Sequence, residues 1–436
     1  MSDTHPPEKP PDQPGDQPKQ PSSPETRKRA FKLLFFSLTC LGMGQSLMFA
    51  NLPPIARELG FSEFHVGAIF MVSAIFWVFC APMLGRRSDI WGRRPVILVG
   101  LIAYAISTAA FGFIIQMALW GWLAVVPAVV LLVLARILYG GLGAGTIAAG
   151  QAYVADRTSR AERVRAVAGM NAGFSLGVTI GPGVGAALVV FGLLMPFYGV
   201  ALLALVSAVS LYLMLPEQTP PKGQTMRPRL SPFDRRVWPF LLASIMITTV
   251  QALTIQTAAF YFMDVLGLAT AETVQYVGIG LMASAMAAVL AQLAIIPRLN
   301  PSAQFLMRIG CVIGIAAYIM FLLADSYGPL VFALVISGLA FGLARPGIAA
   351  AASLSVRQDE QGSVAGLVGA TGAAGHVISP IFAMPLYKID PSLPYLAGVI
   401  LFAMFGLMVM LNGTIRQAGR SLAEDSRGGH DEPTSL

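Results

Sequence analysis

The chain has 436 residues, of which 56% are hydrophobic and only 12% are charged, about half the charged fraction of an average soluble domain. Its mean hydropathy is +0.69. A soluble domain of this composition would expose too much apolar surface to stay dispersed, and a disordered chain would carry more charge. These values exclude an ordinary soluble enzyme. They leave room for a dozen membrane-spanning helices of about 20 residues each.

Polar segments divide the chain. Residues 1–30 contain eight prolines among acidic, amide, lysine and serine residues, so we expect a disordered cytoplasmic tail and no signal peptide. Residues 216–236 are proline-rich and basic and predict a cytoplasmic linker, and residues 416–436 predict a second tail. Two six-helix bundles are therefore expected, one over 31–215 and one over 237–415.

The expected fold is an all-α membrane protein with twelve transmembrane helices in two six-helix pseudo-repeats. Apolar runs of spanning length carry this prediction. The predicted spans are 31–52, 65–84, 95–116, 122–153, 165–190, 194–215, 237–262, 273–296, 304–325, 328–354, 362–386 and 393–415.

The distribution of basic residues predicts the orientation. With the N-terminus inside, 25 of the 29 Lys and Arg residues fall on the inner side or in the tails, and only Arg57 and Lys388 fall outside. Cytoplasmic loops carry such an excess of positive charge. We therefore expect a multi-pass protein of the cytoplasmic (inner) membrane with both termini inside. The net charge of +7 then needs no nucleic-acid partner.

The two halves repeat. Residues 141–150 (GLGAGTIAAG) align with 338–347 (GLAFGLARPG), and 167–169 align with 364–366 at the same offset. Chance similarity in Gly- and Ala-rich spans is the alternative explanation. Parallel six-helix repeats joined by a linker are typical of transporters with a central binding site between the halves.

The loop after the second span carries four arginines and one aspartate within ten residues, from Gly85 to Arg94. An inside-positive loop explains the arginines but not Asp89, which needs a cation or a helix N-terminus as partner. Gly85 allows a neighbouring helix to approach closely.

This loop resembles the cytoplasmic signature of the major facilitator superfamily, G-x-x-x-D-[RK]-x-G-R-[RK], with Ile90 departing from the usual basic residue. The resemblance implies that Asp89 faces the start of helix eleven at Gly362–Ser363. It also implies that an arginine of the motif pairs with Asp156, so that the loop latches the two halves on the cytoplasmic side. The residues of this latch are Gly85, Asp89, Gly92, Arg93, Arg94 and Asp156.

Glycines recur at every fourth position along the fifth span, and such a stripe lets another helix pack closely. The stretch from Gly177 to Gly185 resembles the helix-5 motif of the antiporter branches of this superfamily, above all the twelve-span drug:proton exporters, with Ala186 replacing the last glycine. The resemblance implies export. The motif residues are Gly173, Gly177, Gly181, Pro182 and Gly185.

Two cations lie within spans. A charge in mid-membrane costs at least about 2.5–3.5 kcal/mol on insertion scales, so each should face a cavity or a partner. Arg136 lies in a segment that resembles the family's helix-4 motif, whose arginine is implicated in proton coupling or in the substrate cavity. Arg345 precedes Pro346. For both arginines the alternative is structural, with the side chain bonded to carbonyls of an interrupted helix.

All 22 acidic residues fall in tails, in loops or near span ends. Many exporters of cationic drugs keep an acid in the cavity, in the first helix especially, yet the first span here offers only Gln45 and Asn51. A cavity with Arg136 and Arg345 and no acid has a positive potential. We therefore expect anionic or zwitterionic substrates.

Proton coupling needs a titrating group, and His376 in the eleventh span suits the task because imidazole titrates near neutral pH. A packed neutral histidine is the alternative, and His65, Asp89 and Asp264 are further candidates for the titrating group. Polar and aromatic residues that could line the cavity, each also compatible with helix packing alone, are Gln45, Asn51, Gln251, Gln256, Gln292, Tyr139, Tyr153, Trp77 and Phe260.

The sequence thus predicts a secondary transporter that works by alternating access, exporting a small amphipathic molecule against inward proton movement. An importer or facilitator of an organic anion on the same fold is the alternative. A membrane enzyme or receptor is disfavoured because no catalytic, nucleotide-binding or metal-ligand pattern is found. The expected partners are a small-molecule substrate, protons and the bilayer; neither cofactor nor metal is expected, and the protein should be a monomer.

Overall fold

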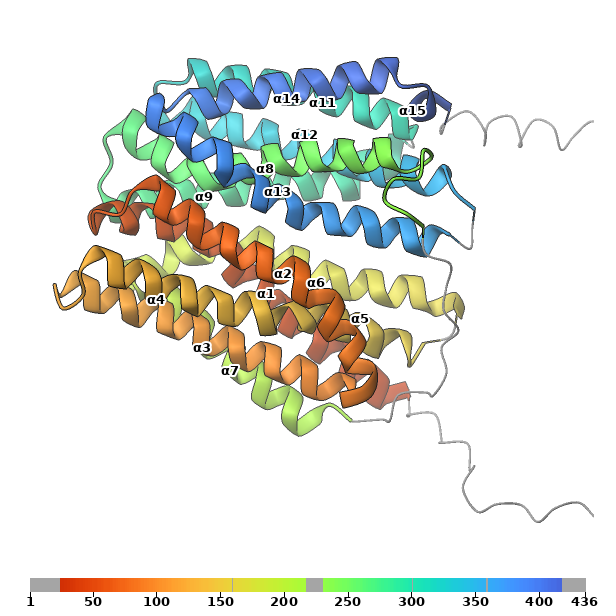
Figure 1. The fold of residues 1–436 in the computed structure, drawn as a ribbon, viewed down its shortest axis with the longest axis horizontal. Helices are drawn as coiled ribbons and strands as arrows, with labels where there is room; N and C mark the ends of the chain where they lie inside the picture. Colours follow the sequence, from red (N-terminus) through yellow and green to blue (C-terminus); the bar gives the residue numbers. More distant parts are fainter. Residues whose placement is uncertain (1–23, 159, 217–229, 300, 358–359, 418–436) are drawn as a thin grey trace, which may run out of the picture.

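The computed structural model describes residues 24–158, 160–216, 230–299, 301–357 and 360–417. The described chain is all helical, and its long helices run side by side (Figure 1). The N-terminal half consists of α1 (Pro24–Glu58), α2 (Glu63–Trp91), α3 (Arg93–Leu119), α4 (Val125–Leu138), η1 (Tyr139–Gly143), α5 (Ala144–Ala155), α6 (Arg160–Leu188), η2 (Val189–Phe191) and α7 (Met195–Met214). The C-terminal half consists of α8 (Trp238–Leu266), α9 (Thr270–Leu290), η3 (Ala291–Ile295), α10 (Ile296–Leu299), α11 (Ala303–Leu323), α12 (Tyr327–Leu354), α13 (Gln361–Ile389), α14 (Leu393–Leu411) and α15 (Gly413–Gln417).

Twelve helical stretches of the described residues are long and apolar enough to cross a membrane, which confirms the predicted fold class. The stretch Arg93–Leu119 brackets the prediction of 95–116. The long predicted run at 122–153 corresponds to the stretch Val125–Ala155. A π-helical turn, η1, interrupts it and begins three residues after Arg136.

The first helix starts earlier than predicted, because residues 24–30 belong to α1 instead of a disordered tail. Pro24 costs no hydrogen bond in the first turn, and Glu25 complements the helix dipole. Arg27 also bonds to the carboxylate of Glu162 at the start of α6, at 3.4 Å. The rest of the predicted tails and linker lies outside the described residues, at 1–23, 217–229 and 418–436.

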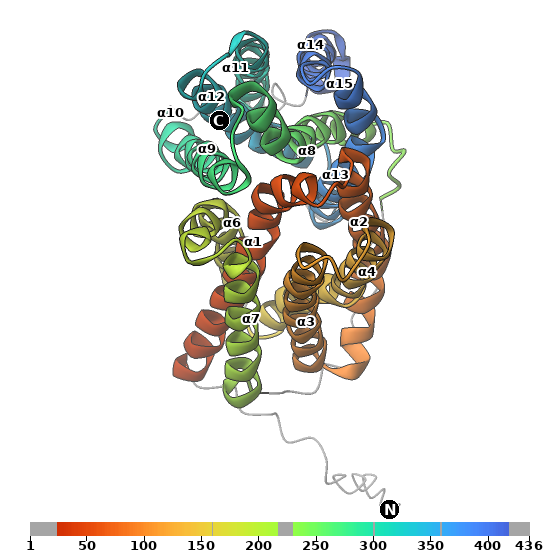
Figure 2. The same cartoon turned by 90° about the vertical axis from the view of Figure 1, so that its left-hand side faces the viewer.

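The two halves lie against each other, and Figure 2 shows them end-on. Contacts between the halves come mainly from α2 with α13 and from α6 with α9, and α1 also touches α8 and α9. We call the end where α1, α8 and α13 begin the linker end, and the end near Glu58 and Leu266, on the left in Figure 1, the distal end.

Backbone-to-backbone packing joins α1 to α6. A side chain at Gly173, Gly177 or Gly181 would collide with a backbone carbonyl of α1. These three glycines are part of the stripe predicted in the fifth span. Helices without side chains between them approach closely enough for dispersion forces over their whole length. The stripe therefore holds the N-terminal half together.

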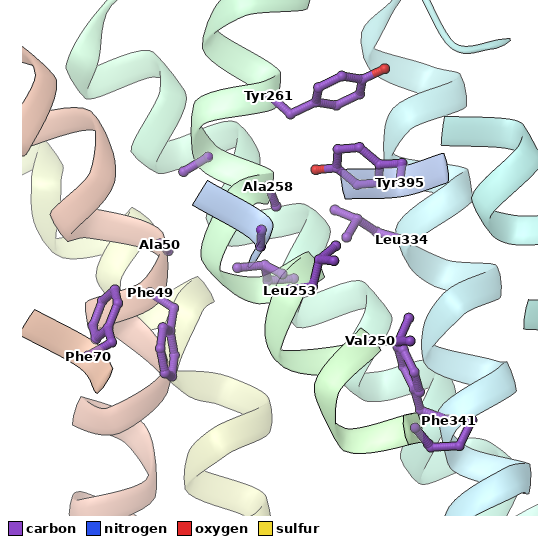
Figure 3. Packing of buried hydrophobic residues seen from close by; sticks show 14 of the residues in the cluster. Phe49, Ala50, Phe70, Val250, Leu253, Ala258, Tyr261, Leu334, Phe341 and Tyr395 are labelled. Carbon is purple, nitrogen blue, oxygen red and sulfur yellow. The ribbon is translucent and has the colours of Figure 1, made fainter. Parts of the chain in front are cut away.

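Aromatic pairs lie among aliphatic side chains in the buried core (Figure 3). Phe49 of α1 and Phe70 of α2 face each other with ring centroids 4.6 Å apart. In the C-terminal half, Tyr261 of α8 lies 4.4 Å from Tyr395 of α14. Aromatic pairs add about 0.5–1.5 kcal/mol each beyond their buried area, and these fill the space on both sides of α8.

Candidate functional site

A cavity of about 420 Å³ lies between the two halves. Helices of both halves line it, which is where a transporter with two repeats places its substrate. Its polar lining includes two guanidinium groups and one imidazole, and the residues that line it include no carboxylate. The lining residues used below are Gln45, Phe49, Trp77, Arg136, Tyr139, Gln251, Arg345, Gly369, Gly372 and His376.

The cavity is closed at the distal end. Gly67 of α2 packs against Pro380 and Met384 of α13, with no room for a side chain. Gly278 of α9 likewise packs against the backbone of Pro182 in α6. These close approaches join the halves on that side.

Toward the linker end the halves are further apart. A side chain added at Gly366, Gly369 or Gly372 of α13 would meet nothing within 4 Å, and the same holds for Gly169 of α6. Two of these glycines, Gly369 and Gly372, line the cavity. The cavity is therefore open toward the linker end.

Arg136 is the most deeply buried charged residue of the cavity, with 1% of its surface exposed. Its Nη2 donates to Gln45 Oε1 at 3.4 Å, and its guanidinium lies over the Tyr139 ring at 4.8 Å. Nε and Nη1 have no hydrogen-bond partner among the described residues. The hydrogen bond of Arg136 thus goes to a side chain and not to a carbonyl of the interrupted helix.

Arg345 repeats this arrangement in the other half. Its Nη1 donates to Gln251 Oε1 at 3.3 Å. Pro346 does not break α12, which is helical from Tyr327 to Leu354. The hydrogen bond of Arg345 thus goes to Gln251 and not to the backbone carbonyl that Pro346 leaves without a donor. The guanidinium remains at the cavity surface.

His376 also lines the cavity, as the sequence suggested. One ring nitrogen, Nδ1, lies 3.1 Å from the Gly372 carbonyl oxygen. The ring is tilted against Phe49 of the other half at 5.6 Å. A histidine bonded through Nδ1 to a carbonyl has its Nε2 free to accept a proton.

Five of the predicted cavity residues do not line it: Asn51, Tyr153, Gln256, Phe260 and Gln292. Asn51 is fully buried, beside Gly185 of α6, and its amide has no partner among the described residues. Gln256 is fully buried and accepts a hydrogen bond from Ser379 at 3.2 Å. Tyr139 and Trp77 do line the cavity, with ring centroids 5.5 Å apart.

The signature loop forms a charge cluster at the linker end. Arg93 Nε donates to Asp156 Oδ2 at 3.1 Å, the predicted pair, and its Nη1 donates to Ser88 Oγ at 2.6 Å. Asp89 is paired with Arg93 of its own half instead of with the start of α13. Ser363, part of the predicted docking point, instead accepts a hydrogen bond from the Leu230 N–H. The reason is geometric, because the halves are separated at this end.

The other motif residues have structural neighbours. Gly85 lies near Ala148, and Gly92 has a φ of 96°, a conformation that favours glycine. Arg94 lies over the Tyr212 ring at 5.3 Å. Sequence reasoning missed two features: the π-helical turn and an ion pair at the distal end between Arg57 and Asp264.

A family model for the major facilitator superfamily matches residues 34–380. The chain belongs to this superfamily. Its members are transporters, and the curated relatives agree with the drug:proton antiporter branch that the motifs resembled. "Multidrug resistance protein 1" of Bacillus subtilis is 25% identical over 383 residues, covering 87% of this chain and 95% of the relative. "Tetracycline resistance protein, class B" of Escherichia coli is 28% identical over 398 residues, covering 85% and 92%.

Solved structures show the same fold. A bacterial homolog of the human lysosomal transporter Spinster, in an inward-facing and occupied conformation, has a TM-score of 0.66 at 17% identity, covering 93% of this chain and 98% of that one. The nucleoside transporter NupG has a TM-score of 0.65 at 17% identity, covering 88% and 97%. The major facilitator fold is therefore established for this chain.

Proposed function

We propose that this chain is a proton-coupled exporter of small amphipathic molecules that carry an anionic or zwitterionic group. It works as a monomer in the cytoplasmic membrane. The linker end, which holds most of the basic residues, lies in the cytoplasm, as the positive-inside rule requires. The structure then corresponds to an inward-open state.

The observation that carries the substrate class is the charge of the cavity. Arg136 and Arg345 line it without a carboxylate among the lining residues. Nε and Nη1 of Arg136 are buried and have no hydrogen-bond partner among the described residues. A carboxylate or phosphate would supply these partners once the side chain turns toward the cavity, because a guanidinium suits bidentate binding of such groups. Trp77 and Tyr139 offer ring faces for the apolar part of the substrate.

Export is supported by two independent features. The helix-5 motif from Gly173 to Gly185 resembles that of the antiporters, and the relatives named for multidrug and tetracycline resistance cover most of the chain. His376 is the candidate proton carrier because its ring lies in the cavity among groups of both halves. Binding of the anion by Arg136 in the same cavity as a titrating imidazole would couple the two ligands through charge.

Inverted membrane vesicles with an acidic interior test this function. Anionic, neutral and cationic amphiphiles are added in turn, and a pH-sensitive dye follows proton release. We expect release with anions, lost in Arg136→Ala and His376→Ala vesicles but kept in Arg298→Ala, a control arginine outside the cavity. Release with cations alone would refute the substrate class and keep the antiporter. No release with any compound would refute coupled export.

The absence of a carboxylate from the cavity lining also fits an importer or facilitator of an organic anion on the same fold. Whole cells separate the two functions. Uptake of a labelled anion that depends on Arg136 and continues without a proton gradient would favour the facilitator.

A further inference from the structure

A closed ring of contacts inside the N-terminal half surrounds the Arg136 guanidinium. Its Nη2 donates to Gln45 Oε1 of α1 at 3.4 Å, and the group lies over the Tyr139 ring at 4.8 Å. On α3, the Tyr104 ring lies 4.8 Å from the Tyr139 ring. A side chain at Gly44, the residue before Gln45, would collide with the Tyr104 hydroxyl. The contacts therefore run from α4 through η1 and α3 to α1 and back to Arg136.

Polar atoms without partners gather in this region. Among the described residues, Arg136 Nε and Nη1 and the hydroxyls of Tyr104 and Thr108 have no hydrogen-bond partner. All three residues are at most 1% exposed. Thr108 lies one turn after Tyr104 on α3, next to its hydroxyl. Buried polar atoms are almost always paired in folded proteins, so these donors and acceptors need one another.

Arg136 has no counter-charge in its surroundings. Tyr104 and Tyr139 are the titratable groups that interact electrostatically with its guanidinium, and the residues that line the cavity include no carboxylate. A buried charge is tolerated when hydrogen bonds satisfy it. Gln45 supplies one such bond. The remaining donors must find neutral oxygen acceptors, and a hydroxyl oxygen can serve directly or through a bridging water.

We propose that Tyr104 and Thr108 are positioning residues that hold Arg136 withdrawn into the N-terminal half until an anion binds. Their hydroxyl oxygens accept hydrogen bonds from Nε and Nη1, directly or through one buried water molecule. An anion in the cavity offers stronger, charge-assisted bonds and draws the side chain out. The inference rests on the proposed function for the anion alone, because the position of Arg136 does not depend on it.

The withdrawal sets the affinity and the selectivity of the cavity. When only a fraction of the molecules presents Arg136 to the ligand, the apparent affinity falls by that fraction. A neutral ligand offers the guanidinium no stronger bond than the hydroxyls do, so it leaves the side chain in place. Arg345 is the contrast in the same cavity: it is exposed and bonded to Gln251, so it is available without rearrangement.

Chemical labelling of arginine tests the withdrawal without any substrate. Phenylglyoxal condenses with guanidinium groups that it can reach, and mass spectrometry of the peptides locates and times each adduct. The full chain is labelled in lipid nanodiscs, where the reagent enters from the open linker end. In the parent protein we expect Arg345 to react rapidly and Arg136 slowly. Equal rates for the two arginines would overturn the withdrawal.

Tyr104→Phe and Thr108→Val each remove one hydroxyl with little change in side-chain shape. We expect each variant to speed the labelling of Arg136 about tenfold, as for the loss of one hydrogen bond to a charged group. The rate for Arg345 should stay the same, which shows that the cavity is intact. The double variant should exceed the single ones by less than their product, because both hydroxyls serve one guanidinium.

Tyr318→Phe is the matched control. It also removes the hydroxyl of a fully buried tyrosine, but in the C-terminal half, where this hydroxyl donates to the Val250 carbonyl at 3.0 Å. Its loss should leave the labelling of Arg136 unchanged. Faster labelling of Arg136 in this control would mean that general loosening explains the effect, and would overturn the specific role of Tyr104.

An anionic fluorescent amphiphile, anilinonaphthalene sulfonate, tests the competition with binding. Only the signal that Arg136→Ala removes is counted. Tyr104→Phe should bind this probe severalfold more tightly than the parent protein, because less free energy is needed to draw Arg136 out. N-phenylnaphthylamine has the same aromatic frame without the sulfonate. It should bind the parent protein and Tyr104→Phe equally well.

Unchanged labelling of Arg136 in both Tyr104→Phe and Thr108→Val would overturn the withdrawal. Faster labelling together with unchanged or weaker binding of the sulfonate would overturn the competition with the anion. If no protein, the parent included, bound the sulfonate through Arg136, the result would count against the proposed substrate class. The labelling rates would still decide where Arg136 lies, so the two proposals can fail separately.

Discussion

Arg93 and Asp156 form an ion pair that ties the start of α3 to the end of α5, with Nε 3.1 Å from Oδ2. Both side chains are largely buried, at 8% and 13% exposure. Asp156→Asn removes one charge and leaves Arg93 with Asp89 and Ser88. We expect thermal unfolding of the purified protein in detergent to report a loss of about 1.5–3 kcal/mol. Unchanged stability would contradict this role.

Asp89 should behave differently from Asp156. Its side chain is 55% exposed, so Asp89→Asn should cost about 0.5 kcal/mol or less. If Asp89 docks on the other half in the outward-open state, the same change should slow transport severalfold in inverted vesicles. Equal loss of stability and transport in both variants would contradict a separate latch role for Asp89.

The glycine stripe predicts that a Gly→Leu substitution will affect stability very differently at two positions of α6. Gly177→Leu places a side chain against the Thr39 backbone and should destabilise the protein by about 1–3 kcal/mol or more. Gly169→Leu, on the same helix at an exposed position with open space around it, is the matched control and should change stability little. Thermal unfolding of the two variants in detergent compares them directly, and similar melting temperatures would argue against close packing of α1 on α6.

The linker end of α8 is clamped to α13 by charge. Arg236 bonds to the carboxylates of Asp234 and Glu360 at 2.9 and 3.0 Å. These side-chain hydrogen bonds hold the pKa of both carboxyl groups below its usual value. The stabilisation is present above the unfolded pKa values of about 3.9 and 4.3 and is lost as the pH falls through the lower folded values.

Amide exchange over residues 230–237, corrected for intrinsic rates, checks this pH dependence. Protection should be constant from neutral pH to about 4.5 and fall below it. Glu360→Gln should weaken protection already at neutral pH. Asp390→Asn is the control, because Asp390 also has a lowered pKa, but through Ser392 in another loop. Identical exchange in Glu360→Gln and the parent protein at pH 7 would contradict the clamp.

Hydropathy predicted the spans because membrane crossing is a property of composition over about 20 residues. It could not predict the π-helical turn at Tyr139–Gly143, since backbone register depends on packing around Arg136. The only local signal was the glycine-rich stretch itself. The start of the first helix was also predicted too late: α1 begins at Pro24, where Arg27 forms a tertiary contact with Glu162 that the local sequence does not show.

The sequence predicted candidate site residues where a polar side chain occurs within an apolar span, because such a residue is improbable there. Arg136, Arg345 and His376 are polar groups in apolar spans, and all three line the cavity. Asn51 and Gln256 gave the same kind of signal yet lie outside the lining. The positions of these two amides do not indicate which face of the helix is buried against a neighbouring helix, because the spans are apolar on all sides.

The close packing of α1 on α6 has a mechanical consequence. Along its length α1 carries Arg27 at the linker end, Gln45 beside the cavity and Arg57 at the distal end. With no side chains between α1 and α6 at the glycine positions, little slack remains for one helix to slide on the other. Over the stretch from Gly173 to Gly181 the two helices should therefore move together as one body when the protein changes conformation.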